Sequence, residues 1–362
     1  MKNLYEIYSS LLANEENWNP TRKTDIEHDI DIIFKEPNTK NFIMEILFYS
    51  EDLHPLAIKT YHYLKTDIEE QKNFLEKISK HAISLYFLGI YFLSHLSLAN
   101  LNLPKWDSNK HRNFLHHWLA ISFFHDLGYF IEKNQQIYPI AEYCKLDNIL
   151  KKIGVSFDLR ETENLKIISN YFEYRIQQHQ LIDHGIIGAF MLYDALMKYD
   201  QKHQKLEEAG AIIFSEHLTH GESNRNNIAE YAKIIAAHNM WYATDLAGKI
   251  IYKNYNLDEL IAKEDGSHRI NINQNPLLFL LCLFDTVEPL KRYIGDNQSY
   301  ENIEKILKNI NIDLQKESSK IIIHIIDDVG QVLSEHASTL EEWIDVRFNK
   351  ISASNFNIEI ML

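Results

Sequence analysis

The most informative stretch of this chain reads WLAISFFHDLGY, from Trp118 to Tyr129. An almost wholly apolar run ends in adjacent His125 and Asp126, and Gly128 follows two residues later. Because glycine commonly ends helices, the stretch predicts a buried helix whose C-terminal end carries an imidazole beside a carboxylate. Burying both groups is costly unless each is satisfied. A transition-metal ion satisfies both, since imidazole and carboxylate are among its ligands.

Four further apolar segments each carry one side chain of a type that binds metal. These side chains are, in chain order, His81, His184, His238 and Asp285. If His125 and Asp126 are counted as one position, consecutive candidates along the chain lie 44 to 58 residues apart. This spacing suits one contribution from each of several helices, converging in the middle of a bundle.

The composition and the apolar periodicity predict a mainly α protein. Only 11 Gly and 7 Pro occur in 362 residues, which is below the usual share of both. Helices are expected over residues 66–92, 116–130, 181–198, 228–237, 276–293 and 332–348, and strands over 320–326 and 356–361. The polar stretches 199–227 and 253–275 are expected to be loops. The fold class is therefore a helical bundle with a small C-terminal α/β element.

The charge balance narrows the class of partner. The chain has 51 acidic and 37 basic side chains and a formal net charge of −14. An extended nucleic acid is not expected as a partner, because its binding requires clustered Lys and Arg. A small phosphorylated substrate remains compatible, since bound cations reverse the local field.

Neither a membrane span nor secretion is expected. The segment 82–104 has no charged residue, but it contains several Ser, Asn and His side chains and lacks a flanking basic cluster, so it predicts a buried helix. Cys144 and Cys282 cannot form a disulfide framework, and the N-terminal residues show no signal-peptide pattern. We therefore expect a cytoplasmic protein without a membrane partner. A bundle with a strand-rich tail is also compatible with a homodimer.

The order His … His-Asp … His … His … Asp resembles the HD-domain superfamily of metal-dependent phosphohydrolases. The resemblance covers residues 66–300, and two local details strengthen it: Gly188-Ala189 after His184, and Asn239 after His238. It implies an HD-type catalytic domain over 66–300. An N-terminal helical cover over 1–65 and a small α/β element over 301–362 would flank that domain.

The resemblance also implies roles for six residues. His81, His125, Asp126 and Asp285 would hold one divalent metal. His184 and His238 would hold a second, and Asp126 would bridge the two. A binuclear centre lowers the pKa of a bridging water and yields a hydroxide nucleophile at neutral pH. Asp126 and His125 would be the catalytic residues of this centre. The implied activity is hydrolysis of a nucleotide-like phosphoester. The enzyme would be a phosphodiesterase or a phosphomonoesterase. Ligand sets of His and carboxylate suit Mn, Fe, Co, Ni or Mg.

Two alternatives remain open on the same ligand set. One is a di-iron oxygenase of the HD type, resembling myo-inositol oxygenase, and the other is a regulatory module in which the metal is only structural. Tyr129 stands where many family members have a substrate-binding Lys, which weakens the phosphohydrolase assignment. Arg292, Tyr129 and His117 are the candidates for substrate binding.

Overall fold

The computed structural model describes residues 1–12, 69–95, 110–133, 143–152, 155, 165–208, 222–240, 246–257, 260, 270–293, 300–317 and 319–362. These residues fall into two compact units. The first unit contains the described residues of 1–12, 73–95 and 270–362, and the second contains residues 69–72 and the described residues between 110 and 260. The first unit thus combines the beginning and the end of the described chain. The division into 1–65, 66–300 and 301–362 stays a prediction.

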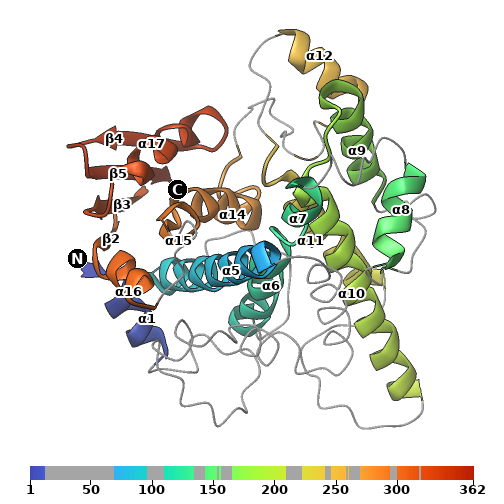
Figure 1. Ribbon diagram of the computed structural model, residues 1–362, viewed down its shortest axis with the longest axis horizontal. Helices are drawn as coiled ribbons and strands as arrows, with labels where there is room; N and C mark the ends of the chain where they lie inside the picture. Colours follow the sequence, from blue (N-terminus) through green and yellow to red (C-terminus); the bar gives the residue numbers. More distant parts are fainter. Residues whose placement is uncertain are drawn as a thin grey trace. The chain divides into compact units, whose positions relative to one another are not determined.

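The second unit is helical in its described part. Its helices are α6 (Lys110–Phe124), α7 (Tyr129–Lys133), α8 (Tyr143–Lys152), α9 (Lys166–His179), α10 (His184–Glu208), α11 (Glu222–Ala237) and α12 (Leu246–Asn254). The long helix α10 packs along α11 and also contacts α6, α7 and α9. Figure 1 shows α10 and α11 in yellow-green and yellow. This packing brings the ends of α6, α10 and α11 together.

The first unit combines helices with a small sheet. Its helices are α1 (Leu4–Leu12), α5 (Glu69–His95), α14 (Pro276–Val287), α15 (Pro289–Tyr293), α16 (Tyr300–Lys308) and α17 (Val332–Ser338), with a short 3₁₀ turn at Leu340–Glu342. Every residue of α14 is buried. A helix that is apolar on all sides belongs in a core, so Asp285 near the end of α14 is a buried carboxylate.

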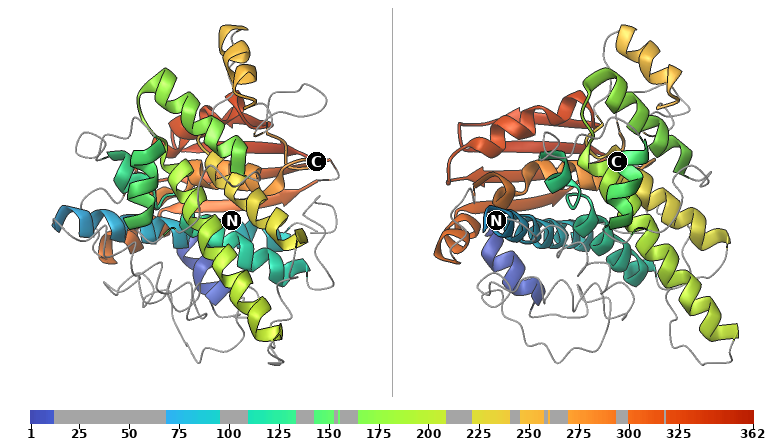
Figure 2. Two further views of the ribbon diagram at one scale, coloured as in Figure 1. Left: turned by 90° about the vertical axis from the view of Figure 1, so that its right-hand side faces the viewer. Right: turned by 45° about the vertical axis from the view of Figure 1, so that its right-hand side comes forward.

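The sheet has five antiparallel strands in the order β1-β2-β3-β5-β4. The strands are β1 (Lys2–Asn3), β2 (Ile310–Lys316), β3 (Lys320–Asp327), β4 (Val346–Lys350) and β5 (Asn355–Met361). Figure 2 shows β2, β3, β4 and β5 side by side in orange and red. Along β3 and β5 buried and half-buried residues alternate, as expected for strands with one face on a core. Helix α17 contacts β3, β4 and β5.

The structure confirms the mainly α fold with a small C-terminal sheet, and the two expected strands appear as β3 and β5. Several boundaries were wrong. The helix expected over 276–293 breaks at Glu288, whose extended backbone precedes Pro289, because proline disfavours helical angles in the residue before it. The helix expected over 332–348 ends at Ser338, because β4 pairs with β5 instead.

The polar stretch 199–227 is less of a loop than expected. Helix α10 continues to Glu208 and α11 starts at Glu222, while 209–221 lie outside the described residues. Of the expected loop 253–275, the described part contains the end of α12 and turns. Nearly all of the N-terminal cover expected over 1–65 also lies outside the described residues.

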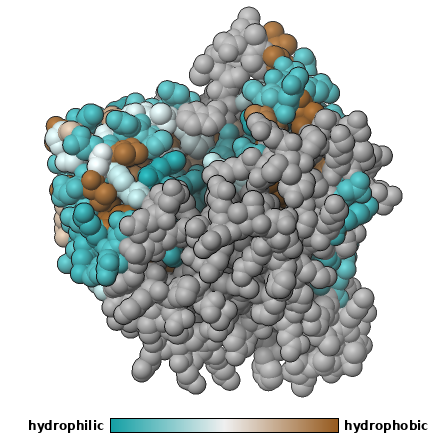
Figure 3. Space-filling view, viewed as in Figure 1, coloured by the Kyte–Doolittle hydropathy of each residue, from teal (hydrophilic) through white to brown (hydrophobic). Residues whose placement is uncertain are grey.

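Residues 82–95 of the charge-free segment lie in α5, and the rest of that segment lies outside the described residues. The side chains from Ala82 to Leu93 are buried or half-buried. Within the described ranges, none of the helices has the length and apolar content needed to cross a membrane. On the coloured part of the surface in Figure 3, hydrophobic residues form small separate areas among hydrophilic ones.

Candidate metal centre

The second unit places four of the six predicted ligands at helix ends. His125 and Asp126 lie in the turn directly after α6, His184 is the first residue of α10, and His238 directly follows α11. All four are buried. The three helices pack against one another, so side chains far apart in the sequence meet in one place.

The oxygen and nitrogen atoms of this group are close enough to share a cation. The Asp126 Oδ1 atom lies 3.4 Å from His125 Nε2 and 3.2 Å from His184 Nε2. The ring of His238 lies 5.2 Å from that of His125 and 5.1 Å from that of His184, centroid to centroid. Asp126, His184 and His238 each offer a ligand atom, and these atoms all lie within 4.8 Å of one another. Two imidazoles and a carboxylate form a donor set that fits a divalent transition metal.

The hydrogen bonds of the histidine rings fix which nitrogen is available to a metal. The Nδ1 atom of His125 lies 2.6 Å from the carbonyl oxygen of Ser122, and that of His238 lies 2.6 Å from the carbonyl oxygen of Ile235. A carbonyl oxygen can only accept, so Nδ1 carries the proton in both rings. The lone pair of each neutral ring is therefore on Nε2.

His184 is held by a carboxylate instead. Glu132, in α7, accepts hydrogen bonds from His184 Nδ1 at 2.5 Å and from the His184 backbone amide at 3.0 Å. The amide of Asn239 lies 2.8 Å from His184 Nε2. Asp183 accepts a hydrogen bond from the backbone amide of Gly185 at 2.8 Å, which is the contact of a helix N-cap. The contact of Asp183 fixes the start of α10, and the contacts of Glu132 fix the orientation of the His184 ring.

Two glycines allow the helices to approach closely. A Cβ atom on Gly188 would lie 2.2 Å from the carbonyl oxygen of Phe124, and one on Gly128 would lie 2.2 Å from the carbonyl oxygen of His184. Distances this short are forbidden for any side chain. The absence of side chains at these two positions therefore brings the His125-Asp126 turn against the first turn of α10.

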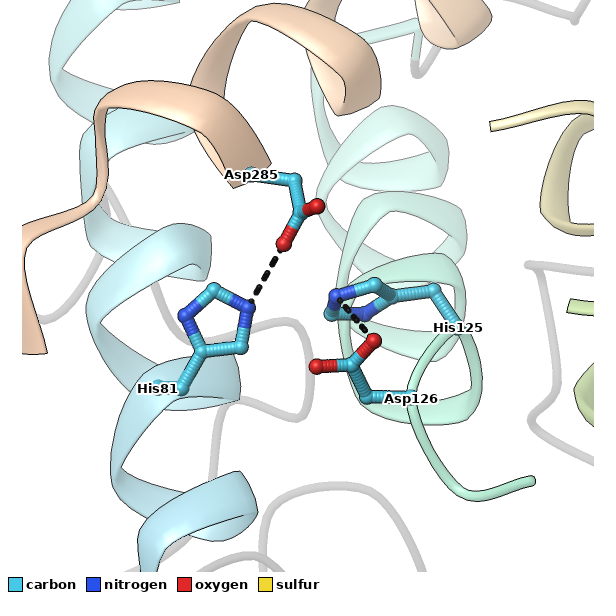
Figure 4. A group of neighbouring side chains, drawn as sticks. All are labelled: His81, His125, Asp126 and Asp285. Carbon is cyan, nitrogen blue, oxygen red and sulfur yellow. Dashed lines mark hydrogen bonds and ion pairs between the residues drawn. The ribbon is translucent and has the colours of Figure 1, made fainter. Parts of the chain in front are cut away.

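The first unit contains the other two predicted ligands. His81, in α5, is held by two acidic residues: its Nε2 lies 2.9 Å from Asp285 Oδ1 and its Nδ1 lies 2.6 Å from Glu288 Oε2. Asp285 Oδ1 also accepts a hydrogen bond from the ammonium of Lys291 at 2.6 Å. Figure 4 draws the His81–Asp285 pair of the first unit and the His125–Asp126 pair of the second, each with its dashed line.

Two of these histidines have strongly raised pKa values. Burial by itself would lower the pKa of His81, but the charge of Glu288 and hydrogen bonds to Asp285 and Glu288 raise it to about 9. Burial opposes protonation of His184 too, yet hydrogen bonds to Asp126 and Glu132, with nearby carboxylate charges, raise its pKa to about 10. Both sites therefore favour a positive charge. A metal ion would supply that charge and replace the proton on Nε2.

The three residues predicted to bind substrate lie in different surroundings. The half-buried ring of Tyr129 lies 4.2 Å from the ring of His184, centroid to centroid. His117 packs edge-on against Tyr231 at 4.4 Å, between α6 and α11. In the first unit Arg292 acts electrostatically on His336, and Lys291 is the basic residue that contacts Asp285.

Sequence reasoning missed Glu132 and Glu288 as partners of the ligands. Glu288 directly follows the apolar run of α14, and a carboxylate at that position was a usable signal of a buried partner. Glu132 gives no such signal, because it lies beside Lys133 in a short mixed segment. Its contact with His184 spans 52 residues and depends on the tertiary fold.

Comparisons with known proteins found no matching family model, no matching curated protein and no matching solved structure. Support for the site therefore comes from its geometry alone. The protein is mainly helical and contains buried His and Asp groups that could hold metal ions.

Proposed function

We propose that this protein is a metal-dependent phosphohydrolase of the HD type that acts on a small, nucleotide-like phosphoester. The observation that carries the proposal is the buried group of Asp126, His184 and His238, whose ligand atoms lie within 4.8 Å of one another. The order of these residues along a helical chain, with a His-Asp pair after an apolar helix, also supports it.

The proposed centre would hold two cations. His184, His238 and Asp126 would hold one of them. As the resemblance of the sequence implies, His81, His125, Asp126 and Asp285 would hold the other. The Nδ1 protons on His125 and His238 support this division, because they leave Nε2 as the ligand atom.

Two bound divalent cations would supply an activated water and neutralise charge on the phosphoryl group. The residues of the chain hold, orient and balance charge around them. Asp126 brings negative charge to both positions, and Glu132 fixes the ring of His184. Among the residues predicted to bind substrate, Tyr129 has the strongest support, because its ring lies against His184 and its phenol can donate a hydrogen bond.

The ligand types favour Mn, Fe, Co, Ni or Mg, since the group contains imidazole and carboxylate but no thiolate. A small phosphorylated substrate rather than an extended nucleic acid, a cytoplasmic location and a homodimer remain predictions from the sequence.

The experiment is elemental analysis of reconstituted protein combined with phosphate release from a panel of nucleotides, mononucleotide esters and cyclic nucleotides. We expect two metals per chain and metal-dependent release from at least one member. Asp126→Asn should abolish both, whereas Asp147→Asn, in an exposed α8 pair with Lys151, should change neither. Less than one metal per chain would overturn the proposal. Two metals with iron-dependent oxygen consumption and no hydrolysis would replace it with the oxygenase.

A further inference from the structure

The four candidate histidines are held in two different ways. His125 and His238 donate from Nδ1 to backbone carbonyl oxygens, which are neutral. His81 and His184 contact carboxylates through Nδ1, at Glu288 and Glu132 respectively. A carboxylate behind an imidazole fixes the ring and makes its other nitrogen a stronger ligand, so the two kinds of histidine differ in their intrinsic affinity for a cation.

Glu132 is tied to His184 by more than one contact. One oxygen, Oε2, accepts both the ring Nδ1 proton and the backbone amide of His184. These two contacts hold the Glu132 carboxylate at the start of α10.

Glu288 is held even more firmly within the first unit. Its side chain is fully buried, and its Oε2 lies 2.6 Å from His81 Nδ1. The Glu288 carboxylate also accepts hydrogen bonds from the backbone amides of Leu290 and Lys291, at 2.9 Å and 2.8 Å. A buried carboxylate is costly unless it is hydrogen-bonded in this way. The break between α14 and α15, which Pro289 enforces, places these two amides around the carboxylate.

We propose that Glu132 and Glu288 are positioning residues that set the metal affinity of His184 and His81. The inference rests on the proposed binuclear centre. Each unit contains one histidine backed by a carboxylate: His184 by Glu132 in the second unit, and His81 by Glu288 in the first.

Glutamine substitutions test the proposal on the full-length protein, with Mn²⁺ alone as the probe. Glutamine keeps an oxygen that can accept the Nδ1 proton but lacks the negative charge. Each of Glu132→Gln and Glu288→Gln should weaken the binding of one Mn²⁺ by about 10- to 100-fold and leave the other nearly unchanged. The control is Glu230→Gln, at an exposed α11 pair with Lys233, and it should bind as the native chain does.

Two measurements separate a positioning role from a merely structural one. Binding is measured by competition with a fluorescent chelator, and thermal unfolding is measured on the metal-free proteins. Metal-free Glu132→Gln should unfold at nearly the native temperature, while the absorption bands of its Co²⁺ form should shift. If Glu288→Gln does not fold, Glu132→Gln decides the question alone.

The outcomes distinguish this inference from the proposed function. Native protein that binds two Mn²⁺ ions, with unchanged affinities in Glu132→Gln, would overturn the positioning role and leave the centre intact. Native protein that binds no Mn²⁺ would overturn both.

Discussion

Asp126 of the second unit and Asp285 of the first are both buried carboxylates beside histidines, but their surroundings differ. Asp126 Oδ1 lies within 3.4 Å of two imidazole nitrogens, whereas Asp285 Oδ1 contacts one imidazole and the ammonium of Lys291. The second unit thus contains a ligand group that could hold a cation by itself. The first unit already provides a counter-ion for its carboxylate, so a cation there competes with Lys291.

The largest effect should come from breaking the two carboxylates in turn. We expect Asp126→Asn to remove both metals and to lower hydrolysis of bis(4-nitrophenyl) phosphate by about 1,000-fold or more, since metal stabilisation of the transition state is worth several kcal/mol. Asp285→Asn should remove only one metal. Elemental analysis and steady-state kinetics measure both effects. Retention of two metals by Asp126→Asn would contradict the shared role of this residue.

The next effect concerns helix packing. Gly188→Ala in the second unit places a methyl group 2.2 Å from the carbonyl oxygen of Phe124, and overpacking of this kind costs about 1–3 kcal/mol of unfolding free energy. Gly330→Ala in the first unit meets the ring of Tyr293 at 3.1 Å and should cost less. Urea unfolding of both variants, with metal retention measured alongside, checks the order. Equal losses would show that the close approach of α6 and α10 is not the constraint.

Removal of the Lys291 ammonium tests the difference in counter-ions between Asp285 and Asp126. Lys291→Met removes the ammonium from Asp285, so the metal-free protein should lose about 1.5–3 kcal/mol of stability, the range of a hydrogen bond to a charged group. A bound cation takes over the counter-ion role, so the loss should shrink at saturating metal. Chemical denaturation with and without metal measures it.

The control for this prediction is Lys233→Met, which breaks a more exposed pair with Glu230 and should cost no more than about 0.5 kcal/mol. If Lys291→Met lost the same stability with and without metal, Lys291 and the cation would not share Asp285.

The smallest effect should come from His336, on α17 of the first unit. Burial and the charge of Arg292 lower its pKa below the ordinary value, against a weaker opposing effect of Glu335. The unfolded chain therefore takes up the proton first, and stability falls as the pH drops through about 6.5, the ordinary histidine pKa. His336→Asn should remove this part of the pH dependence, well under about 1 kcal/mol for a side chain so accessible to solvent. Urea midpoints at pH 7.5 and 5.5 measure it, and an unchanged difference between them would refute it.

Much of the fold was accessible from the sequence, because apolar periodicity survives in a single chain. It located α6, α10, α11 and α14 and the strands β3 and β5, but not their ends. The kink at Glu288 followed from Pro289 and could have been predicted. The pairing of β1 with β2 could not, since it joins residues about 310 positions apart and depends on the tertiary fold.

For the candidate site, the types of side chain could be predicted from the sequence, but the hydrogen bonds that hold each of them could not. The places of His125, Asp126, His184 and His238 at helix ends could be predicted, because each lies at the end or the start of an apolar segment. Glu132 could not be predicted, because an acidic residue that contacts a histidine 52 positions away looks like any other acidic residue in the sequence. Glu288 was predictable in principle from its place directly after the apolar run of α14.

The most direct test of the binuclear proposal is anomalous X-ray scattering from crystals of the full chain grown with Mn²⁺ or Fe²⁺. The account predicts a peak about 2.0–2.3 Å from Nε2 of His184, Nε2 of His238 and an oxygen of Asp126. It also predicts a second peak within ligand distance of Asp126. A metal bound through Nδ1 of these histidines, or ordered metal only at other residues, would contradict it.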